Sequence, residues 1–274
     1  ALDWMAELGF NFVRIPSDYR FWIDGFAYLR PDEAVFAAFD GYLAACRERG
    51  LHMSLNLHRA PSYCINRNDL ERDNLWLDQV AQRRPVRPDP RRTRRAHRAH
   101  RRRDPGDRSG PRDRDRRPGR RPRHLAMPEL AGLGVTHSGR GYQPMPVSHH
   151  RASWWPGHAD APPPEYPGRR WEGRVWDRAT LREFYRPWRE VEAAGAAVHI
   201  GECGCYNKTP NDIALRWLGD LFGLYREFGW GFALWNFAGD FGIVNHGRPG
   251  ARYEQIGGFK VDRDLLEILL ASRT

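Results

Sequence analysis

Lysine is scarce in this sequence, and long apolar runs are absent from it. Of the 44 basic residues only Lys208 and Lys260 are lysines, so nearly all of the positive charge is arginine. Such a bias indicates a GC-rich gene. No apolar run approaches the roughly 20 residues that a membrane-spanning helix needs, and no signal-peptide pattern opens the chain. The sequence as it stands is therefore not expected to span or bind a membrane.

Cysteine is also infrequent. The chain has four cysteines, at positions 46, 64, 203 and 205. Four cysteines do not make a disulfide framework for a chain of this length. The Cys203-Gly-Cys205 pair lacks the second, spaced pair that a structural zinc site requires. We therefore assign both residues to packing and expect neither a metal nor another cofactor.

Residues 83–124 contain no aromatic residue, and Val86 is their only large aliphatic one. The segment holds 19 Arg, 7 Pro and 5 Asp, which gives it a formal charge of +14. Because the whole chain carries +10, the remaining residues carry −4, which is a mildly acidic balance. The basic character of the chain therefore belongs to one segment.

Five apolar, strand-like segments end in a polar or aromatic residue. The most informative is Ala197-Val-His-Ile-Gly-Glu202, in which an apolar run delivers one carboxylate at its end. The other four segments end at Arg14, at His58, at the Arg140-Gly-Tyr142 pair and at Trp235. In a barrel of parallel strands such ends meet at one face, where an enzyme can aim a nucleophile into a cleft.

Segments with helical periodicity alternate with these strands. The expected strands are 10–15, 51–57, 134–138, 197–202 and 232–235, and the expected helices are 31–49, 181–192, 213–228 and 265–270. A short helix also opens the chain, with Gly9 as its C-terminal cap. The alternation predicts parallel pairing and an α/β fold. Because a helix precedes the first strand, we expect a strand to be missing at the N-terminus, and the compartment stays open between secreted and cytoplasmic.

Six motifs occur in a fixed order: VRIP, LNLHRAP, RGYQPM with SHHRASW, GECG, ALWNF with GDFGI, and KVDRDLLEILL. Together they resemble glycoside hydrolase family 5, the cellulase-like (β/α)8 TIM barrels, over residues 1–82 and about 125–274. The resemblance implies a single barrel domain across 1–274 with Glu202 as the nucleophile. It implies substrate-binding roles for Arg14, His58, Tyr142 and Trp235. Many members carry histidine where this chain has Arg140, so that contact is expected to differ in detail.

One hallmark of the family is missing. The acid/base glutamate belongs in an Asn-Glu-Pro at the end of the fourth strand, and no Asn-Glu pair occurs in the chain. That strand would lie between His58 and Arg140, where residues 83–124 interrupt the pattern. The barrel is therefore expected to be incomplete, with its fourth and fifth strands replaced by a disordered segment.

Three interpretations of residues 83–124 are open. An arginine-rich arm would bind nucleic acid or another polyanion by neutralising phosphates. A disordered basic insertion would have no partner. We favour translation out of frame, because a GC-rich gene read in a wrong frame yields mostly Arg, Pro, Ala and Gly. A genuine arm would rarely displace catalytic strands, so we expect no specific nucleic-acid partner.

Each candidate residue also has a structural alternative. The Arg14 guanidinium would keep Glu202 ionised and oriented, or it would form an ion pair at its own strand end. Tyr142 would stabilise the charge of an oxocarbenium-like state, or it would be a rim tyrosine with a hydrated hydroxyl. His58 would bind a sugar hydroxyl or pack internally. His149 is a further candidate for substrate contact.

Sugar rings present apolar C–H faces, and an indole at a strand end offers a flat surface of the right size, which makes Trp235 a platform candidate. Its apolar neighbours Phe232, Leu234 and Phe237 also fit core packing. Four further tryptophans follow in a long loop: Trp154, Trp155, Trp171 and Trp176. We expect some of them to line outer subsites and others to fix the loop.

The sequence thus predicts a monomeric, retaining, endo-acting hydrolase of a β-glucan or related polysaccharide. Its activity is expected to be impaired, because Glu202 has no acid/base partner. Two alternatives stay open: a carbohydrate-binding barrel without catalysis, and polyanion binding through residues 83–124.

Overall fold

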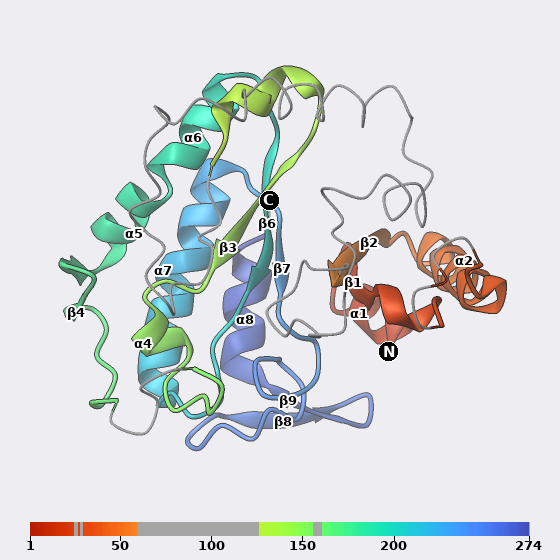
Figure 1. Ribbon diagram of the computed structural model, residues 1–274. Helices are drawn as coiled ribbons and strands as arrows, with labels where there is room; N and C mark the ends of the chain where they lie inside the picture. Colours follow the sequence, from red (N-terminus) through yellow and green to blue (C-terminus); the bar gives the residue numbers. More distant parts are fainter. Residues whose placement is uncertain (25–26, 28–29, 60–125, 156–160, 274) are drawn as a thin grey trace. The chain divides into compact units, whose positions relative to one another are not determined.

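The computed structural model describes residues 1–24, 27, 30–59, 126–155 and 161–273 (Figure 1). The chain divides into two units, Ala1–Arg120 and Arg121–Thr274, and each is described separately. The arginine-rich segment 83–124 lies outside the described residues, as does the region expected to hold the fourth and fifth strands. The prediction of one interrupted barrel domain therefore stays a prediction.

The first unit contains a strand–helix–strand crossover. Strand β1 (Phe12–Asp18) pairs in parallel with β2 (His52–Arg59), and Arg14 lies opposite Ser54. Helix α2 (Glu33–Glu48) connects them, and the Asp32 carboxylate caps it by accepting from the Ala34 N–H at 2.9 Å. The smaller elements of this unit are α1 (Leu2–Glu7) and the 3-10 turn η1 (Tyr19–Phe21). The predicted strands and helices are confirmed here, with ends shifted by one to three residues.

The second unit is built on a parallel sheet with the strand order β3-β6-β7. Its strands are β3 (His137–Gly141), β6 (Val198–Cys203) and β7 (Phe232–Leu234). Helices α5, α6 and α7 lie along one side of it in Figure 1. The helices are α4 (Met145–Ser148), α5 (Arg178–Phe184), α6 (Arg186–Ala193), α7 (Asn211–Phe228) and α8 (Arg263–Ala271). Parallel strands joined by helices confirm the predicted α/β class.

The core of the second unit lies between α7 and the sheet. One face of α7 is fully buried, and it carries Trp217, Leu221, Phe222 and Tyr225. Burying a large apolar side chain contributes about 1.5–3 kcal/mol, so this face is a main source of the unit's stability. The helix ends at Gly229, whose left-handed φ of 70° suits glycine at a C-terminal cap.

Two predicted elements were placed wrongly. The helix predicted over 181–192 breaks at Tyr185, because Pro187 lacks the N–H that a continuous helix requires and instead lies in the first turn of α6. The strand predicted over 134–138 runs over His137–Gly141 instead. Gly134 ends the 3-10 turn η2 (Pro128–Leu133) with a φ of 63°, so the extended segment begins later.

Two antiparallel hairpins were not predicted. Strands β4 (Arg169–Trp171) and β5 (Arg174–Trp176) form one, and β8 (Tyr253–Ile256) and β9 (Phe259–Asp262) form the other. Within the described part of the chain, no helix is long and apolar enough to cross a bilayer.

Candidate active site

The candidate site of the second unit is centred on Glu202, near the end of β6. The Tyr142 hydroxyl donates a hydrogen bond to Glu202 Oε1 at 2.7 Å. The Arg140 guanidinium forms an ion pair with the other carboxylate oxygen, with 3.6 Å between Nη2 and Oε2. The Glu202 side chain is 12% exposed, so both partners act where solvent screens them weakly. A phenol and a guanidinium thus hold one carboxylate.

Strand register brings these residues together. Arg140 on β3 lies opposite Glu202 on β6, immediately after a shift in register at Gly139. Such irregularities turn side chains to a new direction and often occur beside active sites. A Cβ atom on Gly201 would lie against Ser138 Oγ and 3.1 Å from Arg140 Nη1. The glycine before the catalytic candidate therefore leaves the room that the Ser138 hydroxyl occupies, with the guanidinium beside it.

The surroundings keep Tyr142 in its neutral form. Burial raises the pKa of the Tyr142 phenol well above 10, and the adjacent Glu202 carboxylate raises it further. A neutral phenol remains a hydrogen-bond donor, whereas a phenolate would repel the carboxylate. Burial also raises the pKa of the neighbouring Cys203 thiol well above 9, with a smaller contribution from Glu202. Cys203 therefore stays a thiol.

Two buried tyrosines support β3 from the helix side. The Tyr185 hydroxyl donates to the Arg140 carbonyl oxygen at 3.0 Å and lies 2.7 Å from the Tyr225 hydroxyl. A Cβ atom on Gly141 would come within 2.5 Å of Cys203 Cβ and against the Tyr225 hydroxyl. The backbone that carries Arg140 is therefore fixed between a tyrosine pair and β6.

No family model matches the chain, and no curated protein matches it. Among solved structures, one described as the crystal structure of a glycoside hydrolase is 50% identical, with a TM-score of 0.81. The match covers 100% of this chain and 92% of that one. The chain belongs to the glycoside hydrolases.

More distant structures show the fold alone. Thermotoga maritima Cel5A in complex with mannotriose is 19% identical, with a TM-score of 0.57, over 98% of this chain and 88% of that one. The cellulose synthase subunit Z of Clostridioides difficile is 15% identical, with a TM-score of 0.57, over 98% of this glycoside hydrolase and 90% of that chain.

An aromatic rim packs beside Tyr142, the tyrosine that holds the Glu202 carboxylate of this glycoside hydrolase. Phe241 is its centre, with ring-centroid distances of 5.2 Å to His149, 5.4 Å to Tyr206 and 6.1 Å to Trp154. Trp154 is 48% exposed and meets Tyr206 edge to face at 5.0 Å. Tyr206 and Phe241 were not singled out from the sequence, although Tyr206 follows Glu202 by four residues and Phe241 lies in the GDFGI motif.

Trp235 directly follows β7, as predicted for a residue at a strand end. Its backbone N–H donates to the Cys203 carbonyl oxygen at 2.6 Å, next to Glu202 in sequence. A Cβ atom on Gly204 would lie 2.5 Å from the Trp235 carbonyl oxygen, so glycine is required for this approach. Trp235 is only half-buried, which leaves part of its surface outside the core.

Arg14 and His58 belong to the first unit, where neighbouring strands bring them together. Arg14 Nη2 donates to Asn56 Oδ1 at 2.6 Å and lies 3.4 Å from His58 Nδ1. The polar strand ends of β1 and β2 thus form one cluster, with Asn56 as a member that the sequence reasoning missed. The predicted contact between Arg14 and Glu202 joins the two units and stays a prediction.

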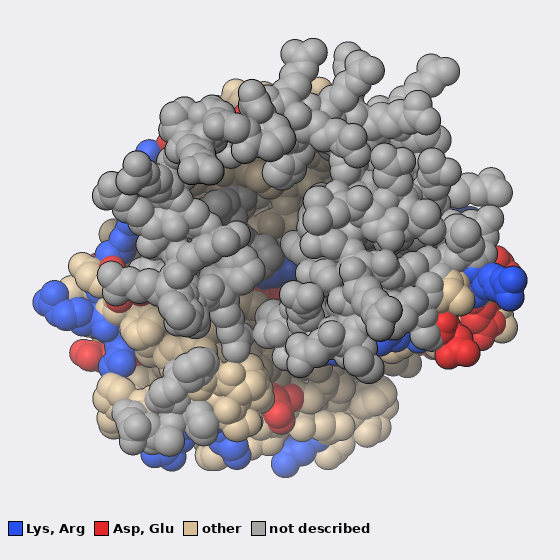
Figure 2. All heavy atoms as spheres, in the orientation of Figure 1, with Lys and Arg blue, Asp and Glu red and all other residues tan. Residues whose placement is uncertain are grey.

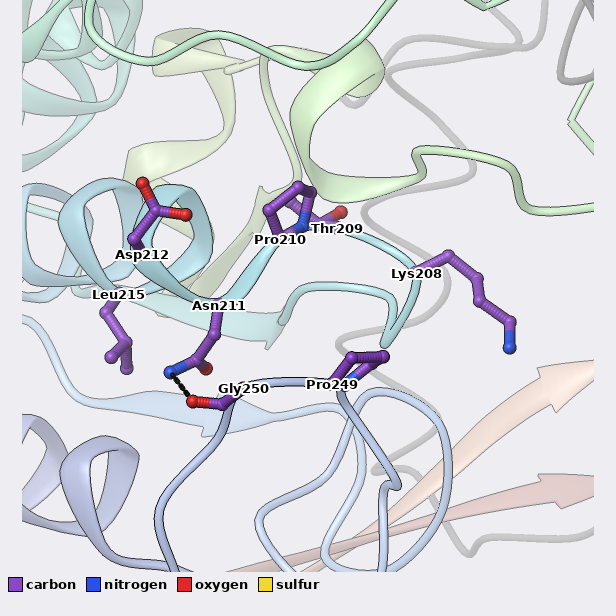
Figure 3. A pocket seen from close by; sticks show the side chains of 8 residues that line it. All are labelled: Lys208, Thr209, Pro210, Asn211, Asp212, Leu215, Pro249 and Gly250. Atoms are coloured by element: carbon purple, nitrogen blue, oxygen red, sulfur yellow. Dashed lines mark hydrogen bonds between the residues drawn. The ribbon is translucent and has the colours of Figure 1, made fainter.

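A groove of about 560 Å³ lies outside this site, at the start of α7 (Figure 3). Its lining comprises Lys208, Thr209, Pro210, Asn211, Asp212, Leu215, Pro249 and Gly250. The Asn211 amide closes one side by donating to the Gly250 carbonyl oxygen at 3.2 Å. The only carboxylate of the lining, Asp212, is paired with Arg216 at 2.8 Å, so the groove offers no catalytic pair.

The described surface carries both signs of charge. Basic and acidic side chains lie beside one another in Figure 2. The ion pairs Arg186–Glu190 (2.7 Å) and Arg252–Asp264 (2.5 Å) are examples. Among the residues that the structure describes, no group of three or more His, Cys, Asp or Glu is arranged to hold a metal ion.

Proposed function

We propose that this glycoside hydrolase is a family 5-like (β/α)8 barrel that cleaves β-glycosidic bonds of a polysaccharide with retention of configuration. The observation that carries the proposal is the contact of Glu202 with both Tyr142 and Arg140 at the end of a parallel strand. A nucleophilic carboxylate must be ionised and aimed. The guanidinium places a positive charge beside this carboxylate, and the two contacts fix its orientation.

Glu202 attacks the anomeric carbon, the bond from that carbon to the leaving-group oxygen breaks, and a covalent glycosyl ester forms. The departing oxygen takes up a proton, from solvent where the acid/base carboxyl is missing. Water then attacks the anomeric carbon and frees the Glu202 carboxylate. Tyr142 and Arg140 hold the carboxylate during the attack, and they stabilise it again when it leaves the sugar. A retaining enzyme also needs an acid/base carboxyl about 5–5.5 Å from the nucleophile. The sequence has no Asn-Glu pair. We therefore propose that this chain hydrolyses ordinary glycosidic bonds about 10²–10⁴-fold more slowly than an enzyme with the acid/base carboxyl.

The substrate is proposed to be a β-1,4-glucan or a related β-glycan, bound without a cofactor by a monomeric enzyme. Trp235 and the exposed Trp154 offer flat apolar faces to sugar rings. Arg14 and His58 would contact hydroxyl groups. The distant relative Cel5A has been crystallised with cellobiose and with mannotriose, so glucan and mannan oligosaccharides are the first ligands to test.

An activated inhibitor separates the nucleophile from the missing acid. In a 2-deoxy-2-fluoro-β-cellobioside with a 2,4-dinitrophenyl substituent, the dinitrophenolate leaves without being protonated. Formation of the glycosyl-enzyme therefore requires only the nucleophile. We expect the intact mass to rise by one fluorocellobiosyl group, and peptide mapping to locate it on Glu202. Glu202→Gln should stay unlabelled. Labelling at another residue, or equal labelling of the glutamine variant, would refute the role of Glu202.

A second candidate function is saccharide binding without turnover, which the absent Asn-Glu pair favours. Calorimetric titration with cello-oligosaccharides that shows binding, together with no covalent labelling, would support it. Polyanion binding through residues 83–124 is tested by heparin chromatography of the full chain and of a variant without that segment. Equal retention of the two would exclude it.

A further inference from the structure

His246 lies in the loop between β7 and β8, and its side chain is fully buried. Its Nε2 lies 3.0 Å from Oδ2 of Asp262, whose side chain is also fully buried. The other Asp262 oxygen accepts the Leu265 N–H at 3.1 Å and so caps helix α8. One carboxylate thus joins the imidazole to the start of a helix.

Counting protons fixes the state of the His246 ring. The Arg248 backbone N–H donates to His246 Nδ1 at 3.1 Å. A backbone N–H only donates, so Nδ1 must accept and is therefore unprotonated. The Tyr253 hydroxyl is farther from Nδ1, at 3.4 Å, and donates to the Arg248 carbonyl oxygen. The neutral ring then carries its proton on Nε2 and donates it to Asp262.

The charges around the ring favour the same state. Burial alone would raise the pKa of the Asp262 carboxyl, but hydrogen bonds from His246 and from the Leu265 N–H lower it below its ordinary value. The Arg248 guanidinium is buried as well, and its charge lowers this pKa further. Asp262 is thus an ionised acceptor whose charge Arg248 already balances. A second proton on His246 would add an unbalanced buried charge.

The loop that His246 anchors holds the segment that follows β6. Arg248 Nη2 donates to the Cys205 carbonyl oxygen at 2.8 Å. Asn207 Nδ2 donates to the His246 carbonyl oxygen at 2.6 Å. These two contacts fix the chain on both sides of Tyr206.

The same loop carries Phe241, the centre of the aromatic rim. Asn207 Nδ2 also lies 3.2 Å from the Asp240 carboxylate, to which it donates. The rings of Tyr206 and Phe241 are 5.4 Å apart between centroids. The position of each ring therefore depends on contacts between the two loops, and these contacts meet at His246.

We propose that His246 is a positioning residue for the aromatic rim, fixed by Asp262 as its Nε2-protonated tautomer. Its Nδ1 anchors the Arg248 backbone, and this anchor sets Tyr206 against Phe241. The effect on saccharide binding rests on the proposed function. The tautomer and the anchor depend only on the buried contacts and are tested without a ligand.

Long-range proton–nitrogen NMR on the full chain labelled with ¹⁵N-histidine measures the tautomer. The variant His246→Gln identifies the ring signals by their loss. In the unaltered protein we expect a protonated Nε2 and an unprotonated Nδ1. A ring protonated on Nδ1, alone or together with Nε2, would overturn the proposal.

Asp262→Asn tests what fixes the tautomer. Its amide oxygen can keep the helix cap, which turns the NH₂ group toward the ring and should shift the proton from Nε2 to Nδ1. Asp177→Asn is the matched control, because it makes the same change at the cap of α5, where Asp177 accepts the Thr180 N–H at 2.7 Å. It should leave the His246 signals unchanged. An unchanged tautomer in Asp262→Asn would refute the role of Asp262.

The anchor is measured by alkylation of the buried Cys205 thiol with iodoacetamide under native conditions, followed by peptide mass mapping. His246→Gln keeps a donor toward Asp262 but removes the acceptor of the Arg248 N–H, so Cys205 should react about 2–10-fold faster. His246→Asn keeps an acceptor at the place of Nδ1 and should react more slowly than the glutamine variant.

Cys203, which is buried in β6, is the internal reference for this experiment. Local opening of the loop should leave its alkylation rate unchanged. Equal acceleration of both thiols would mean that the whole unit is destabilised and would overturn the anchor. An asparagine variant that opens as readily as the glutamine variant would overturn it too.

Covalent labelling by the dinitrophenyl fluoroglycoside measures the effect on the rim. His246→Gln should raise the inhibitor concentration for half-maximal labelling by about 2–10-fold. The limiting rate should stay near that of the unaltered chain, because Tyr142 and Arg140 hold Glu202 independently of this loop. A slower limiting rate with unchanged half-saturation would overturn the rim role. If the unaltered chain is not labelled, the rim role and the proposed function fail together, while NMR and alkylation still decide the tautomer and the anchor.

Discussion

Arg140 and Glu202 are register partners on adjacent parallel strands, and their charged groups approach to 3.6 Å. Backbone pairing, the irregularity at Gly139 and the space above Gly201 all favour this approach. In many family 5 members a histidine takes the position of Arg140. This chain therefore orients its candidate nucleophile with a permanent charge.

Removal of that charge should slow the first chemical step. We expect Arg140→Ala to reduce the rate of covalent labelling by the dinitrophenyl fluoroglycoside about tenfold, which corresponds to about 1.4 kcal/mol. Arg140→Lys should lose less, because it keeps the charge but not the planar fork. Arg252→Ala, which breaks the exposed pair with Asp264, is the control and should label normally. An unchanged rate for Arg140→Ala would contradict the role of the ion pair.

Tyr142→Phe tests the hydrogen bond to Glu202. A hydrogen bond to a charged group contributes about 1.5–3 kcal/mol, so the labelling rate should fall by about 10–100-fold. Tyr185→Phe removes the support under Arg140 and should give a smaller decrease. Circular dichroism should show both variants folded. A larger effect for Tyr185→Phe than for Tyr142→Phe would mean that packing, and not the hydrogen bond, controls the carboxylate.

Alkaline pH should destabilise the second unit. Burial raises the pKa of Tyr185 above 10, and burial together with the Tyr185 charge raises that of Tyr225 further. In the unfolded chain both phenols ionise near pH 10. The native state then holds more protons than the unfolded state, so stability is fully present below about pH 10 and is lost as the pH rises.

Urea unfolding between pH 8 and pH 11 measures this effect. The free energy of unfolding should decrease above about pH 10 in the unaltered chain. Tyr225→Phe should have a flatter pH dependence, because one buried phenol no longer titrates. Tyr42→Phe removes a tyrosine that is 52% exposed and should leave the slope unchanged. Equal slopes in all three proteins would show that other groups control alkaline unfolding.

The origin of residues 83–124 is decided by the gene. If the segment is out of frame, shifting the reading frame by one base near codon 82 should yield apolar strand segments and an Asn-Glu-Pro. Restoring that frame should raise hydrolysis of a soluble β-glucan by about 10²–10⁴-fold, the usual contribution of general acid–base catalysis. A shifted frame without an Asn-Glu pair would refute the interpretation.

Periodicity identified the elements that bury a regular face. α2 and α7 were predicted from apolar residues at helical spacing, and β6 from an apolar run that ends in Glu202. The hairpin of β4 and β5 was missed, because arginine and tryptophan dominate its short strands and no alternation is visible. Tertiary packing, and not local preference, fixes such segments.

The candidate site was predictable where a residue ends a strand. Glu202, Tyr142 and Arg140 meet because parallel strands bring their ends to one edge. Sequence reasoning expected Arg14 to hold Glu202, whereas the described contact of that kind comes from Arg140.

The missing side chain at Gly201 has an evolutionary consequence. A methyl group there would come against the Ser138 hydroxyl, whereas the Arg140 guanidinium would have to yield only slightly. A lineage can therefore enlarge position 201 only after position 138 has lost its hydroxyl. Across related sequences, we expect the two sites to change together, so that serine at position 138 accompanies glycine at position 201.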